Sequence, residues 1–156
     1  MQKAGALLAR RSYSKGELRA RIQKLGDGEQ VEATLARLEE LGLLNDAEYA
    51  YNFAFCRITE MAWGPAKVRS SLIRRHIAPL IAESAIDRVH QEISEELVLT
   101  RYVDKYSEKS GLPGNRRAIQ KLVSHLRSRG FNEDRIWDTL RHKIPAAAWR
   151  KFDTGE

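Results

Sequence analysis

The segment WGPAKVRSSLIRRH, residues 63–76, contains four basic residues and no acidic one. Pro65 directly follows a glycine and suits the first turn of a helix, so the pattern predicts a helix that begins at Pro65. Val68 and Leu72 lie on the same side of this helix as Pro65, because residues three or four apart share a face. The opposite face is polar and basic, and it carries Lys67, Ser70, Ser71 and Arg74.

The same pattern returns in residues 117–130, RAIQKLVSHLRSRG, which lie 54 positions further along the chain. This single offset pairs Lys67 with Lys121, Arg75 with Arg129, Val68 with Leu122, Leu72 with Leu126 and Ile86 with Leu140. His76 and Ile77 then fall on Gly130 and Phe131. The first block offers Leu18, Ile22, Gly26 and, after a gap of one residue, Leu35. A fixed period of this kind predicts three copies of one helical module.

Charge alternates along the chain with the same period. Residues 1–25 contain seven basic residues and one acidic, residues 61–82 contain four basic and none acidic, and residues 113–131 contain five basic and none acidic. Between them, residues 26–60 contain eight acidic and two basic residues, and residues 83–112 contain seven acidic and four basic. A basic helix in each copy therefore alternates with acidic segments.

Cap signals divide the chain into nine predicted helices without a convincing strand. Ser14 with Glu17 forms a capping box, Asn45 with Glu48 begins another helix, and Gly26 with Gly28 ends one. The expected helices cover 2–11, 14–25, 29–41, 47–63, 65–76, 79–89, 92–109, 116–129 and 132–142. The fold class is therefore all-α. We expect three-helix repeats at 1–44, 45–90 and 91–143, followed by a C-terminal tail at 144–156.

Bulk composition restricts the class of partner and compartment. The 156 residues carry a net charge of +6 and a pI near 9.6, which favours an acidic partner such as nucleic acid or an anionic protein surface. Cys56 is the only cysteine and stands among apolar residues, so we expect a buried structural thiol and a reducing compartment. No apolar run is long enough to span a membrane, and the cytosol is the expected location.

Catalytic and metal-binding signatures are missing from the sequence. The four histidines, at 76, 90, 125 and 142, have neither helical ligand spacing nor a cysteine partner. The sequence has no glycine-rich phosphate loop, nucleophile elbow or HExxH motif, so we expect neither an enzyme nor a cofactor. The aromatic run Tyr49, Tyr51, Phe53 and Phe55 could stack on bases, but core packing is the favoured interpretation. Trp137 and Trp149 are likewise expected to anchor packing.

Four segments resemble the RecX family of RecA regulators: ALLARRSYSKGELRARI, LEELGLLNDAEYAYNF, GPAKVRSSL and LVSHLRSRGFNEDRIWDTL, in this order. Together they span nearly the whole chain. The resemblance implies three tandem three-helix units in an elongated, curved array. It also implies a non-enzymatic protein that engages the RecA filament on single-stranded DNA, restrains it, and so regulates recombination, repair and the SOS response. Two departures stand out: Asn45 replaces an aspartate, and His76 replaces a glycine that would end a helix.

Charge and helix face define the predicted binding surface. It consists of Lys67, Arg74, Arg75, Arg117, Lys121, Arg127 and Arg129, with Arg10, Arg11, Arg19 and Arg21 as an amino-terminal extension. Arg69 falls between apolar positions, so we expect it to extend along apolar surface or pair with a glutamate of a neighbouring helix. The expected partners are the RecA filament and single-stranded DNA, with duplex DNA left open, and the expected state is a monomer.

The alternative from another class is a helix-turn-helix regulator that reads a defined duplex site. Three-helix units with one basic helix are compatible with it. However, no helix combines a tight preceding turn with side chains for base edges at its start, and a repeat array has no evident two-fold dimer. Footprinting distinguishes the two classes, since only the helix-turn-helix regulator protects a specific sequence.

Overall fold

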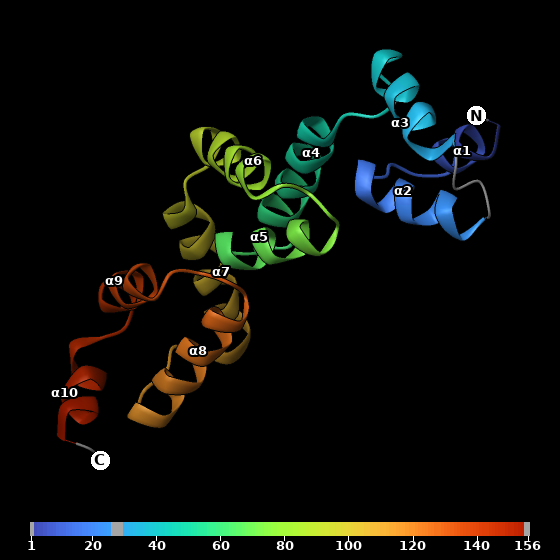
Figure 1. The fold of residues 1–156 in the computed structure, drawn as a ribbon. Helices are drawn as coiled ribbons and strands as arrows, with labels where there is room; N and C mark the ends of the chain where they lie inside the picture. Colours follow the sequence, from blue (N-terminus) through green and yellow to red (C-terminus); the bar gives the residue numbers. More distant parts are fainter. Residues whose placement is uncertain (1, 26–29, 155–156) are drawn as a thin grey trace. The chain divides into compact units, whose positions relative to one another are not determined.

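The computed structural model describes residues 2–25 and 30–154, and within these ranges it contains ten α-helices and no β-strand (Figure 1). This confirms the predicted all-α class. The helices are α1 (Gln2–Leu8), α2 (Lys15–Lys24), α3 (Val31–Glu40), α4 (Asp46–Thr59), α5 (Pro65–Arg74), α6 (Pro79–Glu92), α7 (Glu95–Ser110), α8 (Arg116–Ser128), α9 (Glu133–Lys143) and α10 (Ala146–Thr154). The predicted break at Gly26 and Gly28 lies outside the described residues.

The chain divides into two compact units. Unit 1 consists of residues 1–54 and 69–88, and unit 2 consists of residues 55–68 and 89–156. Helices α4, α5 and α6 each begin in one unit and end in the other, because the unit boundaries fall within them. The three-helix repeat boundaries at 44, 90 and 143 stay predictions.

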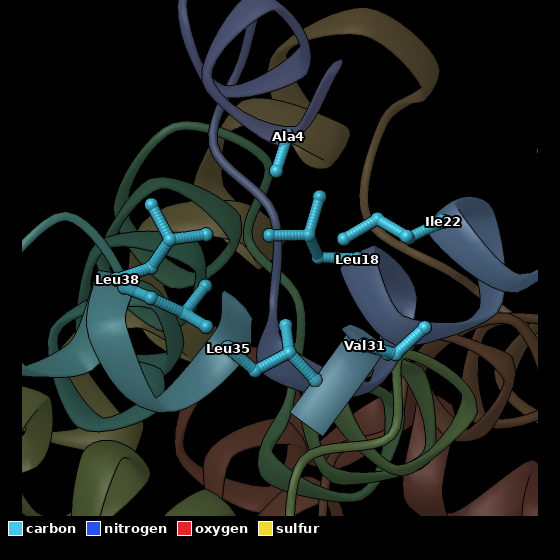
Figure 2. Packing of buried hydrophobic residues seen from close by; sticks show 7 residues of the cluster. Ala4, Leu18, Ile22, Val31, Leu35 and Leu38 are labelled. Atoms are coloured by element: carbon cyan, nitrogen blue, oxygen red, sulfur yellow. The ribbon is translucent and has the colours of Figure 1, made fainter. Parts of the chain in front are cut away.

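One core cluster of unit 1 is formed mainly by the apolar faces of its first three helices (Figure 2). Leu18 and Ile22 of α2 face Val31, Leu35 and Leu38 of α3, and these five side chains are at most 4% exposed. Fully burying an aliphatic side chain contributes about 1.5–3 kcal/mol, so this small cluster is the main source of stability for α1–α3.

The predicted helix starts are confirmed in unit 1. The Ser14 hydroxyl accepts a hydrogen bond from the Glu17 amide at 3.1 Å, and the Glu17 carboxylate accepts one from the Ser14 amide at 3.2 Å. This reciprocal capping box satisfies two backbone donors that the helix itself cannot. The Asn45 side chain likewise accepts from the Glu48 amide at 3.0 Å. Asparagine therefore replaces aspartate at this cap without loss of the bond.

Three helices end with the same backbone arrangement, in which an amide bonds to the carbonyl five residues earlier. The bonds join Leu43 to Leu38 (2.9 Å), Ile77 to Leu72 (3.1 Å) and Phe131 to Leu126 (3.4 Å). The residue before the donor has positive φ in each case: Gly42 at 68°, His76 at 61° and Gly130 at 88°. His76 thus adopts the conformation of the missing glycine, at a cost that glycine would avoid.

Helix α4 buries a different face from the predicted one. Its buried residues are Ala50, Ala54 and Ile58, and each is 0% exposed. The predicted stripe of Tyr49, Phe53 and Cys56 lies beside it, with both aromatic rings half-buried and Cys56 exposed. The prediction of a buried thiol is therefore wrong, and the aromatic residues that were expected in the core are only partly buried. Alanines give a weak hydrophobic signal, yet they form the buried seam.

In unit 2, α9 packs against α7 and α8, and α10 packs against α8. Helix α10 was not predicted and occupies part of the expected tail. Trp149 on α10 lies with its ring centroid 6.2 Å from that of Trp137 on α9, as expected for packing anchors. None of the helices in the described ranges combines the length and apolar character needed to span a bilayer. Over the same ranges, no group of three His, Cys, Asp or Glu side chains could hold a metal ion.

Candidate functional site

Arg69 belongs to a structural ion pair within unit 1. Its guanidinium donates two hydrogen bonds to Glu83 of α6, one from Nη2 to Oε2 at 2.9 Å and a second from Nε to Oε1. This bond lowers the pKa of Glu83 and raises the pKa of Arg69. The prediction that Arg69 pairs with a glutamate of a neighbouring helix is confirmed.

Arg75 is also held by unit 1, through Glu17. Arg75 Nη1 lies 2.9 Å from Glu17 Oε1, and the Tyr49 hydroxyl donates to the other oxygen of Glu17 at 3.1 Å. The arginine lies over the ring of Phe53 at 4.9 Å, and its backbone carbonyl accepts a bond from the Ser14 hydroxyl. Because Glu17 is only 16% exposed, this predicted binding cation serves mainly to neutralise a partly buried carboxylate.

The other predicted cations of unit 1 vary in how strongly they are held. Arg19 forms a two-bond pair with Glu32, at 2.6 and 2.9 Å, which lowers the pKa of that carboxyl. Arg11 lies over the Tyr13 ring at 4.0 Å, and exposed Arg74 donates to the Ser71 hydroxyl at 3.0 Å. Arg10 and Arg21 are exposed, and like Arg11 and Arg74 they have no ion-pair partner among the described residues.

Unit 2 brings the start of α5 against the end of α8 through two glycines. The Gly64 amide donates to the Arg129 carbonyl at 2.8 Å, and the Ala66 amide donates to the Gly130 carbonyl at 3.1 Å. A Cβ atom on Gly64 would lie 2.3 Å from the backbone of Gly130, and one on Gly130 would lie 2.4 Å from the amide nitrogen of Lys67. Only glycine permits this approach, which places Lys67 beside α8.

Arg129 fixes the loop that follows α4. Its Nε donates to the Ala62 carbonyl at 3.1 Å, and its Nη2 donates to the Met61 carbonyl. The guanidinium also lies 4.3 Å from the centroid of the Tyr102 ring. These partners are carbonyl dipoles and a ring, so the positive charge of Arg129 is not neutralised by a carboxylate there.

His125 lies close to two positive charges of unit 2, those of Arg129 and Lys67. The pKa of His125 is lowered, first by partial burial and then by the charges of Arg129 and Lys67. Its Nε2 lies 2.7 Å from the Tyr102 hydroxyl, and the two rings stack with centroids 5.9 Å apart. Lys67 itself lies over the Trp63 ring at 4.5 Å. Burial, together with the charges of Arg129 and Lys67, therefore disfavours the protonated form of His125.

The outer face of α8 carries the remaining predicted cations. The helix buries Ile119, Leu122, Val123 and Leu126, so its opposite face is exposed. Arg117 and Lys121 lie on the exposed side and have no ion-pair partner in the described part of the chain. Arg127 is 3.6 Å from Glu133, and both side chains are at least half exposed. This face offers two unneutralised cations to an anionic partner.

Sequence patterns did not indicate a basic cavity along α7. It encloses about 410 Å³ and is lined on one side by Arg101, Lys105 and Lys109. The three residues belong to the block of residues 83–112, whose charge balance is acidic. A spacing of four residues was the available signal, because it places all three on one helical face.

The described residues form an all-α protein with basic helix faces, and the relatives of this chain are regulatory proteins. The chain is 31% identical over 141 residues to the regulatory protein RecX of Prosthecochloris aestuarii, covering 90% of each chain. It is 31% identical to a regulatory protein RecX of Thermus thermophilus, covering 80% of this chain and 78% of the other. No protein-family model matches. The chain belongs to the RecX family of regulatory proteins.

Solved structures support the fold. The crystal structure of RecX from Lactobacillus salivarius superposes with a TM-score of 0.80 at 21% sequence identity and covers 92% of both chains. A second RecX crystal structure gives a TM-score of 0.76 at 18% identity, covering 90% of this chain and 69% of the other. At these identities the likeness establishes the fold alone.

Proposed function

We propose that this protein is a non-enzymatic regulator that restrains RecA filaments on single-stranded DNA, and so regulates recombination, repair and the SOS response. It would bind along the filament groove as a cytosolic monomer built of three-helix repeats at 1–44, 45–90 and 91–143. The proposed surface comprises Lys67, Arg74, Arg75, Arg117, Lys121, Arg127 and Arg129, extended by Arg10, Arg11, Arg19 and Arg21. Family membership supports the regulatory role.

The observation that carries the proposal is the outward face of α8. Arg117 and Lys121 are exposed and have no ion-pair partner among the described residues, and Lys67 is held beside the helix by the two close-packed glycines. Such cations can meet phosphates without first breaking an ion pair, whereas Arg75 and Arg19 would have to give up Glu17 and Glu32. We therefore expect the cations of unit 2 to contribute more binding energy.

The test is ATP hydrolysis by RecA of the same organism on single-stranded DNA. Wild-type protein should inhibit hydrolysis. Inhibition at a small fraction of the RecA concentration indicates action at filament ends, and inhibition near equal concentrations indicates occupancy of the groove. An unchanged rate at a molar excess over RecA would contradict the proposal.

The surface is tested by reversing two of its charges. Lys67→Glu/Lys121→Glu should abolish most of the inhibition, and Arg135→Glu/Arg141→Glu, which reverses two exposed charges of α9, should leave it within about twofold. Circular dichroism and thermal unfolding check that both variants fold. On bare DNA, each lost phosphate contact lowers the slope of log affinity against log salt by about 0.7. Equal inhibition by the two variants would refute this surface.

Footprinting on genomic fragments addresses the alternative class. A filament regulator should protect no particular sequence, because phosphate contacts carry no sequence information. A discrete footprint would instead support a helix-turn-helix regulator.

A further inference from the structure

The cavity of unit 2 lies between the end of α4, with its following loop, and helix α7. Its volume of about 410 Å³ falls in the range of small-ligand sites. Arg101, Lys105 and Lys109 line one side, and Tyr102 and Tyr106 line the neighbouring side. Apolar side chains complete the lining, including Met61, Ile93 and Val98. The site therefore combines cations, aromatic rings and apolar surface.

Helix α7 separates its charges by function. The three basic residues recur every four positions and share one face, with a rise of about 6 Å between successive members. Two of the four acidic residues of the same helix have partners outside it: Asp104 binds Lys143 at 2.6 Å, and Glu95 accepts a bond from the Asn132 amide at 3.2 Å. Glu95 and Asp104 thus bind residues at the start and end of α9, whereas Arg101, Lys105 and Lys109 line the cavity.

The cavity has an excess of positive charge that the described residues do not neutralise. Arg101, Lys105 and Lys109 are exposed and have no ion-pair partner in the described ranges. Arg129 adds a fourth positive charge to the lining, against the single carboxylate of Glu60. An anionic ligand would therefore replace water around these side chains without displacing an internal partner.

The two tyrosines have different roles. Tyr102 has Arg129 over its ring and its hydroxyl bound to His125, so it is a fixed wall. Tyr106 is half-buried and meets His125 at a tilted angle, with ring centroids 6.2 Å apart. It has no guanidinium over its ring among the described contacts. A planar group entering the cavity can therefore pack against Tyr106, with Met61 and Val98 as apolar neighbours.

We propose that this cavity binds an unpaired nucleotide of single-stranded DNA, with the base against Tyr106 and the adjoining phosphates on Arg101, Lys105 and Lys109. Cations alone would suit any polyanion. A ring and an apolar lining beside them favour a ligand that repeats a planar apolar group next to each anionic group, which describes a nucleic-acid strand. The inference rests on the proposed function for the source of the strand, and it adds a base-binding site distinct from the α8 face.

The first test compares two oligonucleotides by fluorescence anisotropy, a short oligothymidylate and an abasic strand with the same phosphates. A base-binding cavity predicts that the abasic strand binds roughly tenfold more weakly, since stacking of one base is worth that factor or more. Equal affinity for the two strands would show that only phosphates are bound and would overturn the inference.

The second test changes the cavity. Lys105→Gln/Lys109→Gln should weaken oligothymidylate binding roughly tenfold, and Arg135→Gln/Arg141→Gln, which removes the same charge from α9, should change it less than twofold. Tyr106→Ala should reduce the preference for the strand with bases, and Tyr106→Phe should retain it because the ring remains. If Tyr106→Ala fails to fold, the lysine variant and the comparison with the abasic strand still test whether the cavity binds a nucleotide.

The third test locates the base directly. Photocrosslinking with iododeoxyuridine-substituted DNA should label Tyr106 or its cavity neighbours. Labels confined to α5 and α8 would overturn the cavity, while inhibition of RecA would leave the proposed function standing. Cavity labels from a protein without effect on RecA would refute the proposed function alone. If the lysine variant lost binding to DNA-free RecA but kept oligonucleotide binding, the cavity would be a protein-binding site and the inference would be wrong.

Discussion

Arg75 and Arg129 occupy the same position in two copies of one basic helix, 54 residues apart, yet their guanidiniums bind different partners. Both guanidiniums lie over an aromatic ring, that of Phe53 in unit 1 and that of Tyr102 in unit 2. Arg75 then meets a carboxylate, Glu17, whereas Arg129 meets two backbone carbonyls. Arg75 therefore neutralises a carboxylate in unit 1, whereas the positive charge of Arg129 in unit 2 is not paired with a carboxylate.

The difference shows how a duplicated helix can diverge without changing its own charge. The neighbours decide whether a cation is available: the capping glutamate of α2 in unit 1, and the loop after α4 in unit 2. We therefore expect substitutions around Arg75 to change mainly the stability of the protein, and substitutions of the unpaired cations of unit 2 to change mainly its binding.

Gly130→Ala should have the largest effect on stability, because it disrupts the close backbone contact between α5 and α8 that positions Lys67 and Arg129. A Cβ atom there would meet the backbone of Lys67 at 2.4 Å on a residue whose φ is 88°. We expect a loss of about 3 kcal/mol or more in the free energy of unfolding, measured by urea denaturation. Gly114→Ala is the matched control, since no atom lies within 4 Å of its added Cβ. Similar losses in both variants would contradict this account.

The close contact between Gly16 and His76 in unit 1 predicts that substitutions at these two positions have strongly non-additive effects on stability. A Cβ atom on Gly16 would lie 2.2 Å from Cβ of His76, so Gly16→Ala alone should destabilise the protein by about 2 kcal/mol. His76→Gly alone should stabilise it by about 1 kcal/mol, because glycine relieves the positive φ. In the double variant the clash disappears, and the alanine introduced into α2 should become favourable because it is the better helix former. Additive effects in a thermal double-mutant cycle would disprove the contact.

Arg75→Ala should cost about 1–2 kcal/mol of unfolding free energy, because it leaves Glu17 partly buried without its guanidinium. Arg21→Ala, an exposed cation of the same unit, should change stability by less than about 0.5 kcal/mol. Urea denaturation measures both. The comparison between units would fail if Arg75→Ala left stability intact and instead weakened DNA binding as strongly as Lys121→Glu.

The smallest expected effect is a pH dependence from His125 in unit 2. Its pKa is lowered in the folded state, first by burial and then by Arg129 and Lys67, so the native protein binds fewer protons there than the unfolded chain. The stability of the folded state that depends on neutral His125 is therefore fully present above the unfolded pKa of about 6.5, and it is lost as the pH falls below that value. His125→Gln should therefore lose slightly less stability than wild type between pH 7 and pH 5. A steeper loss in the variant would reverse the assigned sign.

The sequence predicted the helices where local signals were complete. Ser14 with Glu17 and Asn45 with Glu48 are caps that depend only on residues three apart, and Pro65 and Pro79 mark helix starts by their fixed φ. Helix α4 was predicted, but its buried face was not, because the buried residues are mainly alanines, and α10 was not predicted at all. Hydrophobic patterns underweight small residues, although a close helix approach favours them.

The predicted cations divide in a way that no sequence pattern revealed. Arg69 was expected to pair because it stands among apolar residues, and it binds Glu83. Arg75 stands in a fully basic segment, and its glutamate lies 58 residues earlier in the chain. The cavity along α7 was not indicated because the net charge of its block includes carboxylates such as Glu83 and Asp104, whose partners lie on other helices.

The sequence by itself determined the all-helical class, the repeated basic helix and most helix starts, because caps, proline and apolar periodicity act within a few residues of each other. Only the tertiary structure decided which cations are neutralised and which line a cavity. The Coulomb energy of a side chain depends on distance in space, and Glu17, Tyr102 and the two close-packed glycines are brought to their partners by the fold.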